Sequence, residues 1–133
     1  MVRIDRPQAV DIIDGLMSAA CRSEVSGIYF LSDSAELLPA SAPAVERIAA
    51  LLKSHPDWNV TIEGHTDNTG SVQHNVDLSK RRAESLRAEL AGRHGISATR
   101  MITAGYGQAR PVDTNQTMDG RAHNRRVEIS RRC

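Results

Sequence analysis

This chain of 133 residues has few aromatic side chains, only two cysteines and almost no net charge. Because aromatic residues make up 3% of the chain, Val, Ile, Leu and Ala must supply most of the core. The formal net charge of +1 creates no overall field that would attract nucleic acid or an anionic membrane. No apolar run is long enough to span a bilayer as a helix. The length fits one domain with a substantial core.

The beginning of the chain does not have the pattern of an export signal. Residues 16–21 faintly resemble a lipoprotein cleavage site, but Asp11 and Asp14 interrupt the apolar segment that such a signal requires. We therefore expect a helical extension over residues 1–24 and the main domain over residues 25–133. Apolar residues in the extension recur at the i, i+3, i+4, i+7 spacing of a short amphipathic helix, at Ile13, Leu16, Met17 and Ala20.

The rest of the chain alternates between strand and helix patterns, in the order β-α-β-α-β-β. Right-handed crossovers make the first three strands parallel to one another. Trp58 is either a platform for stacking on a carbohydrate or a strand-end side chain that closes the core, and we favour the core. Strands are expected at 25–30, 58–63, 100–105 and 124–130, and helices at 41–55 and 75–92, the second ended by Gly92.

A polar loop bounded by Gly64 and Gly70 follows the second strand. In open α/β sheets, ligands bind at the carboxyl ends of strands, which is where this loop lies. Asp67 in the loop is either the cap of a turn or a contact for a ligand. Arg82 on the following helix is either a solvated surface charge or a clamp for an anion. Together the two charges could hold both ends of a zwitterion.

Two further chemistries are weaker alternatives. His65 and Asp67 could be two ligands of a metal ion, but a metal site needs further donors, so we expect a structural histidine and no metal. Ser79, His65 and Asp67 could form a hydrolytic triad on paper. Ser79, however, lies within a helix among charged residues and has no nucleophile elbow, so we do not expect an enzyme.

Arginines near the end of the chain raise the alternative of nucleic-acid binding. They have no aromatic residues between them and no recognised binding fold around them, so we do not expect a nucleic-acid partner. Arg125 and Arg126 lie next to each other at the start of the last strand, and we expect one of them to pair with an acidic side chain. The arginines concerned are Arg121, Arg125, Arg126, Arg131 and Arg132.

Several motifs, in order and correctly spaced, carry a family resemblance. They are Gly64-His65-Thr66-Asp67-Asn68-Thr69-Gly70, then Asn75, Leu78-Ser79 and Arg82-Ala83, then Gly105-Tyr106-Gly107 and Pro111, and finally Gly120 through Glu128. Over residues 25–131 the chain resembles the peptidoglycan-binding C-terminal domain of the outer membrane protein A family. Flagellar stator proteins and peptidoglycan-associated lipoproteins share this domain.

The resemblance implies an α+β two-layer sandwich with a mixed sheet of strand order 1-4-2-3, in which the fourth strand is antiparallel. In that order the ends of strands one and two flank the start of strand four, so one pocket is expected there. The chain departs from the family at Leu31 and Ser32, where an acidic and an aromatic residue are usual. The implied peptidoglycan-binding residues are Leu31, Ser32, Thr66, Asp67, Asn75, Leu78, Arg82, Asn124 and Arg125.

The same strand order brings Cys21, before the first strand, towards Cys133, after the last one. A disulfide between them is geometrically reasonable, and an oxidising periplasm would permit it. Two free thiols are the alternative.

The implied function is non-covalent binding of peptidoglycan through the diaminopimelate of its stem peptide, without a cofactor. Asp67 would bind the ammonium group and Arg82 the carboxylate. Such a domain would act in the periplasm and anchor an envelope protein to the cell wall, with membrane contact only through other parts of the parent protein. The absence of an export signal is what a fragment of a longer protein would show. The sequence leaves open whether the domain forms a homodimer.

Overall fold

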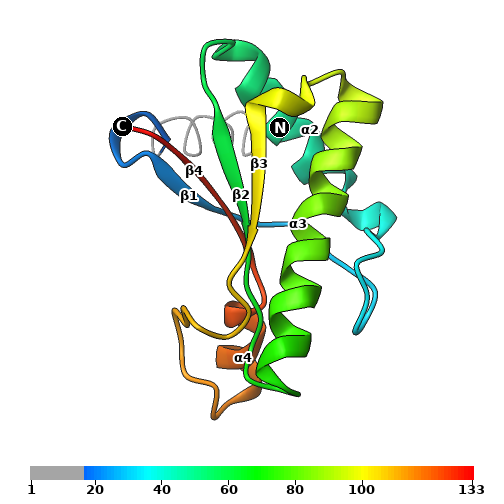
Figure 1. Ribbon diagram of the computed structural model, residues 1–133, viewed down its shortest axis with the longest axis vertical. Helices are drawn as coiled ribbons and strands as arrows, with labels where there is room; N and C mark the ends of the chain where they lie inside the picture. The colour runs from blue at the N-terminus through cyan, green and yellow to red at the C-terminus, as the bar shows by residue number, and fades with distance from the viewer. Residues whose placement is uncertain (1–16) are drawn as a thin grey trace, which may run out of the picture.

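A computed structural model describes residues 17–133, which form a four-stranded sheet of order β1-β4-β2-β3 (Figure 1). β2 and β3 pair in parallel, whereas β4 is antiparallel to both of its neighbours. The predicted mixed sheet and its strand order are therefore confirmed. The strands are β1 (Arg22–Val25), β2 (Val60–Gly64), β3 (Met101–Gly105) and β4 (Val127–Arg131).

Helices α2 and α3 pack against one face of this sheet, which gives the predicted two layers (Figure 1). The helices are α2 (Ala42–Ser54), α3 (Val72–His94) and α4 (Met118–Asn124), and two 3-10 turns cover Pro39–Ser41 (η1) and Ala98–Arg100 (η2). No helix within residues 17–133 combines the length and the apolar character needed to cross a membrane.

The core lies between the helices and one face of the sheet. Along β2, Val60 and Ile62 point into this core and are at most 2% exposed, while Glu63 lies on the opposite face of the sheet. The apolar stripe predicted for α2 is buried, at Val45, Ile48, Ala49 and Leu52. The opposite face of the sheet is polar, because β4 alternates in the same way between core residues and Glu128.

Two glycines let α3 approach the ends of β2 and β3 very closely. A Cβ atom on Gly64 would lie 2.2 Å from the carbonyl oxygen of Ser79, and one on Gly105 would lie 2.4 Å from the amide nitrogen of Lys80. Only glycine therefore fits at these two positions with the helix where it is. These contacts at Ser79 and Lys80 fix the position of α3 on the sheet about one helical turn before Arg82.

The first strand differs from the prediction, because β1 covers Arg22–Val25 rather than residues 25–30. Gly27 adopts a left-handed backbone with φ of 86°, and the chain leaves the sheet edge there. Phe30 then forms only an isolated bridge with Leu37. The domain boundary expected between residues 24 and 25 falls within this strand.

The second half of the chain also differs from the prediction in two places. α3 runs past Gly92, which is exposed, and ends at Gly95, whose φ of 71° provides the left-handed cap. The connection expected to be irregular contains α4, a helix of seven residues capped by Thr117. Asn124 therefore ends a helix instead of starting a strand, and β4 begins at Val127.

The structure joins Cys21 to Cys133 in a disulfide with a Cα–Cα distance of 5.8 Å, the pairing expected from the strand order. Met17 is helical and fully buried, while Ile13 and Leu16 of the expected N-terminal helix lie outside the described residues. Trp58 packs against the core, stacked on His55 and covered by Arg131. Its role is therefore structural, as expected.

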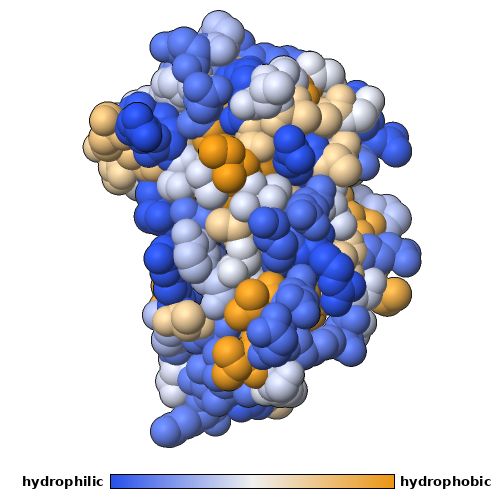
Figure 2. Space-filling model, viewed as in Figure 1, coloured by the Kyte–Doolittle hydropathy of each residue, from blue (hydrophilic) through white to orange (hydrophobic). Residues whose placement is uncertain are grey.

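The surface is mostly polar, and its apolar side chains are dispersed. Figure 2 shows small, separate apolar patches on the face viewed in Figure 1. Single apolar side chains of this kind are normal on a protein surface and indicate no docking face by themselves. The large apolar side chains most exposed among the described residues come from different segments: Tyr29, Leu31, Val72, Ile102, Val112 and Met118.

Candidate functional site

An open groove of about 1040 Å³ lies at the carboxyl ends of β1 and β2. Its walls come from residues 24–30 and 32–33, the loop 66–70, the first part of α3, and residues 122–123 and 125–126 just before β4. This is where ligands bind in open α/β sheets, and it is where the strand order predicted a pocket. The volume is at the upper end of those found for drug-sized ligands.

Asp67 is the buried anion of this groove. The residue is 6% exposed, its Oδ1 accepts a hydrogen bond of 2.8 Å from the Thr69 N–H, and its Oδ2 lies 2.6 Å from Nη1 of Arg125. Burial by itself raises the pKa of the Asp67 carboxyl, but the Thr69 and Arg125 contacts outweigh burial and hold the pKa below its usual value. The carboxylate is therefore ionised at neutral pH.

Arg82 supplies a cation to the same groove from α3. Its Nε donates to the carbonyl oxygen of Ser34 at 2.7 Å, and its Nη2 donates to that of Leu31 at 3.4 Å. The guanidinium also lies 5.0 Å from the centre of the Phe30 ring. Burial lowers the pKa of Arg82, and the nearby carboxylates of Asp33 and Asp67 oppose that effect. The two charges expected from the sequence thus face one groove and act on each other.

The loop around Asp67 is braced by side chains that the sequence placed in the site. Nδ2 of Asn75 donates to the carbonyl of Thr69 at 2.9 Å and to Oε1 of Gln108 at 3.0 Å, and Asn75 is 3% exposed. The Thr66 hydroxyl donates to the carbonyl of Asp67 at 2.8 Å. Both residues line the groove, as does Leu78. Most of the hydrogen bonding of Asn75 and Thr66 therefore holds the loop in shape.

Two of the implied site residues do not line the groove. Leu31 is 49% exposed, and its N–H donates to the carbonyl of Glu36 instead of a ligand. Asn124 is fully buried beneath the 112–115 segment, where its Oδ1 accepts from the Val112 and Asp113 N–H groups. Asn124 lies outside the groove, contrary to the expectation, because it is the last residue of α4 and not the first residue of a strand.

Some main-chain N–H groups near the groove are already hydrogen-bonded within the protein, whereas others are not. The N–H of Thr66 donates to the carbonyl of Gly107, and the N–H of Leu31 donates to the carbonyl of Glu36. Within residues 17–133, the N–H groups of Ser32 and Asp67 make no hydrogen bond, and both residues line the groove. These two are therefore among the main-chain groups that a ligand could engage.

Sequence reasoning missed three contacts between a histidine and a carboxylate at the groove, which involve His74 and His123. Nε2 of His74, in the first turn of α3, lies 2.6 Å from Oδ1 of Asp33. Nε2 of His123 lies 3.3 Å from Oε1 of Glu24, and its Nδ1 lies 3.1 Å from Oδ2 of Asp113. No motif or periodicity indicated these pairs, because each joins residues at least ten positions apart in the chain.

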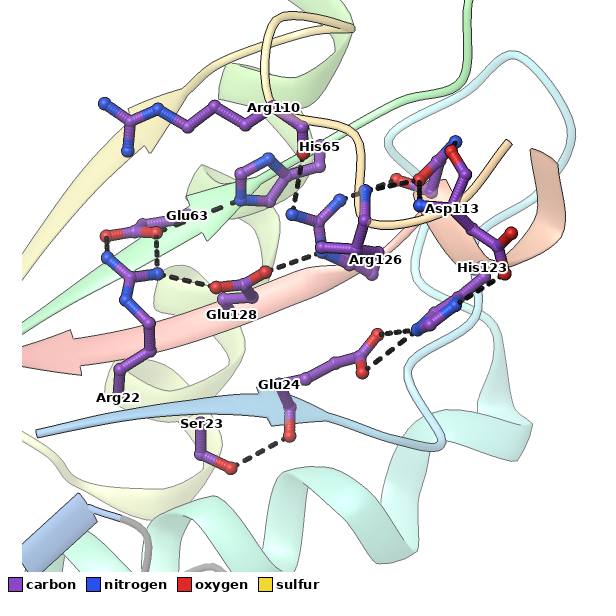
Figure 3. A network of polar contacts seen from close by, with 12 residues as sticks. Arg22, Ser23, Glu24, Glu63, His65, Arg110, Asp113, His123, Arg126 and Glu128 are labelled. Carbon is purple, nitrogen blue, oxygen red and sulfur yellow. Dashed lines mark hydrogen bonds and ion pairs between the residues drawn. The ribbon is translucent and has the colours of Figure 1, made fainter. Parts of the chain in front are cut away.

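A charge ladder lies on the polar face of the sheet (Figure 3). Glu63 and Glu128 lie directly opposite each other on β2 and β4, an unfavourable pairing of like charges. Nη1 of Arg22 lies 2.7 Å from Glu63 and 2.5 Å from Glu128, and Nε of Arg126 lies 2.6 Å from Glu128. Two cations thus balance two anions, and Arg126 is one of the arginines expected to pair with an acidic side chain.

His65 lies beside this ladder and is 3% exposed. Neither ring nitrogen has a hydrogen-bond partner among the described residues, although Nε2 lies 3.8 Å from Oε1 of Glu63. The ring stacks on Tyr106 at a centroid distance of 5.4 Å. Burial is the main cause that lowers the pKa of His65 to about 4, so the imidazole is neutral at pH 7.

The contacts around His65 differ from those that the sequence suggested for either alternative chemistry, a metal site with Asp67 or a triad with Ser79 and Asp67. Its ring and the carboxylates of Glu63 and Glu128 have ligand atoms within 4.8 Å of one another, but both carboxylates already bind arginines. A metal ion there would compete with those arginines for the carboxylate oxygens. The Ser79 hydroxyl donates to the carbonyl of Val76 and accepts from the Gly107 N–H, so it is not bonded to His65.

The sequence profile of the OmpA family matches residues 29–125 of this chain. The peptidoglycan-binding protein ArfA of Mycobacterium tuberculosis is 45% identical over 102 residues, which cover 77% of this chain and 31% of ArfA. The chain thus spans about a third of the length of that relative.

Two solved structures share the fold over most of the chain. The cell wall anchor of the type VI secretion system of Pseudomonas aeruginosa has a TM-score of 0.71 and 28% identity, over 95% of this chain and 97% of that one. The peptidoglycan-associated lipoprotein of Burkholderia pseudomallei has a TM-score of 0.71 and 30% identity, over 79% of this chain and 88% of that one.

Proposed function

The chain belongs to the OmpA family, and on that premise we propose that it binds peptidoglycan through diaminopimelate and so anchors an envelope protein to the cell wall. The site of action would be the periplasm, where a disulfide such as Cys21–Cys133 is stable. Relatives described as a peptidoglycan-binding protein and as a cell wall anchor support this proposal.

The observation that carries the proposal is the pair of opposite charges in one groove. The Asp67 carboxylate uses two of its roughly four acceptor positions, one for Thr69 and one for Arg125, so it can accept hydrogen bonds from an ammonium group. Arg82 uses Nε and Nη2 for main-chain carbonyls and retains Nη1 for a carboxylate.

The ligand that matches this pair is an amino acid group with both of its charges free. The side chain of diaminopimelate ends in such a group, with an ammonium and a carboxylate on the same carbon. A lysine stem residue has only the ammonium and would leave Arg82 without a partner. Losing one charged hydrogen-bonded contact costs about 1.5–3 kcal/mol, or roughly tenfold to a hundredfold in affinity.

The same geometry supports binding without cleavage. The groove offers charges and main-chain donors for recognition, while the buried Ser79 hydroxyl is held by Val76 and Gly107. The domain would therefore retain a sacculus rather than degrade it. Incubation with purified sacculi should cause the protein to co-sediment and release no soluble muropeptide.

The decisive experiment is calorimetric titration with an acetylated stem peptide that contains diaminopimelate, compared with its lysine analogue. We expect the diaminopimelate peptide to bind at least about tenfold more tightly. Asp67→Asn and Arg82→Gln should each remove most of that binding, whereas Arg132→Gln, which removes a charge from the exposed end of the chain, should not. Equal affinity for the two peptides would contradict the proposal, and thermal unfolding of each variant verifies its fold.

A further inference from the structure

Arg125 has hydrogen-bonding capacity that its ion pair with Asp67 does not use. Its Nη1 lies 2.6 Å from Oδ2 of Asp67, while its Nε and Nη2 have no partner within residues 17–133. The side chain is 47% exposed and lines the groove. Nε and Nη2 form one edge of the planar guanidinium, and such an edge can hold a carboxylate with two parallel hydrogen bonds.

Three charged side chains that line the groove, Asp67, Arg82 and Arg125, sum to a charge of +1. Asp67 contributes one negative charge, and Arg82 and Arg125 contribute two positive charges. The two arginines also act on each other, since the Arg125 charge lowers the pKa of Arg82. Glu24 and Asp33 also line the groove, beside His123 and His74, and the Asp33 charge acts on Arg82 as well, while Arg126 pairs with Glu128. A zwitterion has no net charge and would leave the combined charge of Asp67, Arg82 and Arg125 at +1.

We propose that Arg125 binds a second carboxylate of the same stem peptide, so that the groove selects a ligand with one ammonium and two carboxylates. This inference rests on the proposed function. Such a ligand carries a net charge of −1, which matches the excess of Asp67, Arg82 and Arg125. The groove volume of about 1040 Å³ leaves room for groups beyond a single amino acid head.

Two groups of a stem peptide have the required chemistry. One is the α-carboxylate of the γ-linked glutamate that precedes diaminopimelate, and the other is the carboxylate at the end of the peptide. Amidation removes the charge of either one. Arg125 would therefore make the affinity sensitive to the amidation state of the wall, whereas Asp67 and Arg82 would set the preference for diaminopimelate.

Three acetylated diaminopimelate peptides test the inference by calorimetric titration. The reference peptide has an isoglutamine and an amidated end, so that its only charges are those of the distal amino acid group. The second peptide restores the glutamate carboxylate, and the third restores the terminal carboxylate. We expect at least one restored carboxylate to increase the affinity about threefold to fivefold, the effect of one partly exposed charge pair.

Variants then locate that gain. Arg125→Gln should abolish it, Arg125→Lys should retain part of it because the charge remains while the planar fork is lost, and Arg132→Gln should leave it intact. The inference is overturned if neither carboxylate raises the affinity of the wild-type protein, or if the gain persists in Arg125→Gln. Failure of the reference peptide to bind better than its lysine analogue would instead refute the proposed function. Thermal unfolding shows whether each variant is folded.

Discussion

Acid should weaken this fold through a single buried side chain, His65. In the unfolded chain the imidazole has its usual pKa of 6.5, whereas burial lowers the pKa to about 4 in the folded chain. Between those two values the unfolded state binds more protons than the folded state. The free energy of unfolding therefore falls as the pH falls from about 6.5 towards 4.

The magnitude follows from the two pKa values. A difference of about 2.5 pKa units corresponds to roughly 3 kcal/mol in total. About 2 kcal/mol of that is lost between pH 7 and pH 5, and the remainder is lost near pH 4 and below. His65 is 3% exposed, so solvent does not reduce the effect greatly. A loss of this size is a substantial part of the stability of an ordinary domain.

Other titrating groups do not produce the same profile. Hydrogen bonds and ion pairs hold the pKa values of Asp67 and Glu128 below 3.8 and 4.5, so their contributions are lost mainly at lower pH. Asp113 and Glu24 raise the pKa of His123, which is exposed, and this effect favours the folded state on the acid side. The effect of His123 thus has the opposite sign to that of His65.

Urea unfolding of the wild type and of His65→Phe at pH 7, 6 and 5 measures the effect. Phenylalanine cannot titrate and retains a ring that can stack on Tyr106. We expect the wild type to lose about 2 kcal/mol more than the variant between pH 7 and pH 5. His94→Gln, a substitution near the far end of α3, serves as a control that should follow the wild type. Parallel pH profiles for wild type and His65→Phe would refute the role of His65.

Two further substitutions test how the site is supported. Gly64→Ala should destabilise the fold by about 1–3 kcal/mol or more and weaken peptide binding, because its Cβ would lie 2.2 Å from the main chain of the helix that carries Arg82. Gly92→Ala is the control, since a Cβ there meets no atom within 4 Å and should not destabilise the fold. Equal melting temperatures for the two variants would contradict the packing argument. Cys133→Ser should lower the free energy of unfolding by up to about 5 kcal/mol, because the disulfide closes a separation of 112 residues. A reductant should lower the free energy of unfolding of the wild type but not that of Cys133→Ser. If the variant and the wild type had the same denaturation midpoint, a stabilising disulfide would be excluded.

Regular periodicity made most of the fold predictable from the sequence. The core stripe of α2 and the alternation of Val60 and Ile62 in β2 repeat over enough residues to identify the elements. α4 escaped prediction because seven residues contain too few apolar positions to form a stripe. The predicted bounds of the first strand were wrong because Ile28 and Phe30 pack on the core, as strand residues would, without pairing in the sheet.

The candidate site was predictable only where a motif marked it. Asp67 and Arg82 face the same groove, as the family resemblance implied, while Asn124 lies outside it because α4 carries it under the 112–115 segment. The ion pair between Asp33 and His74 joins positions 41 apart, and a single sequence provides no local signal for such a contact. Pairing between distant residues depends on how elements pack, which local patterns do not encode.

Hydrogen bonds within the protein hold two of the charged side chains in the groove, and this has a consequence for binding. Arg82 is held by the carbonyls of Ser34 and Leu31, and Asp67 by the N–H of Thr69. A side chain that is immobile in the free protein loses little conformational freedom when a ligand engages it, so more of the contact energy appears as affinity. Arg125, with one hydrogen bond and a half-exposed side chain, is the least constrained of the three charges. Selection for diaminopimelate should therefore come from the rigid pair, and any adjustment to different stem peptides from Arg125.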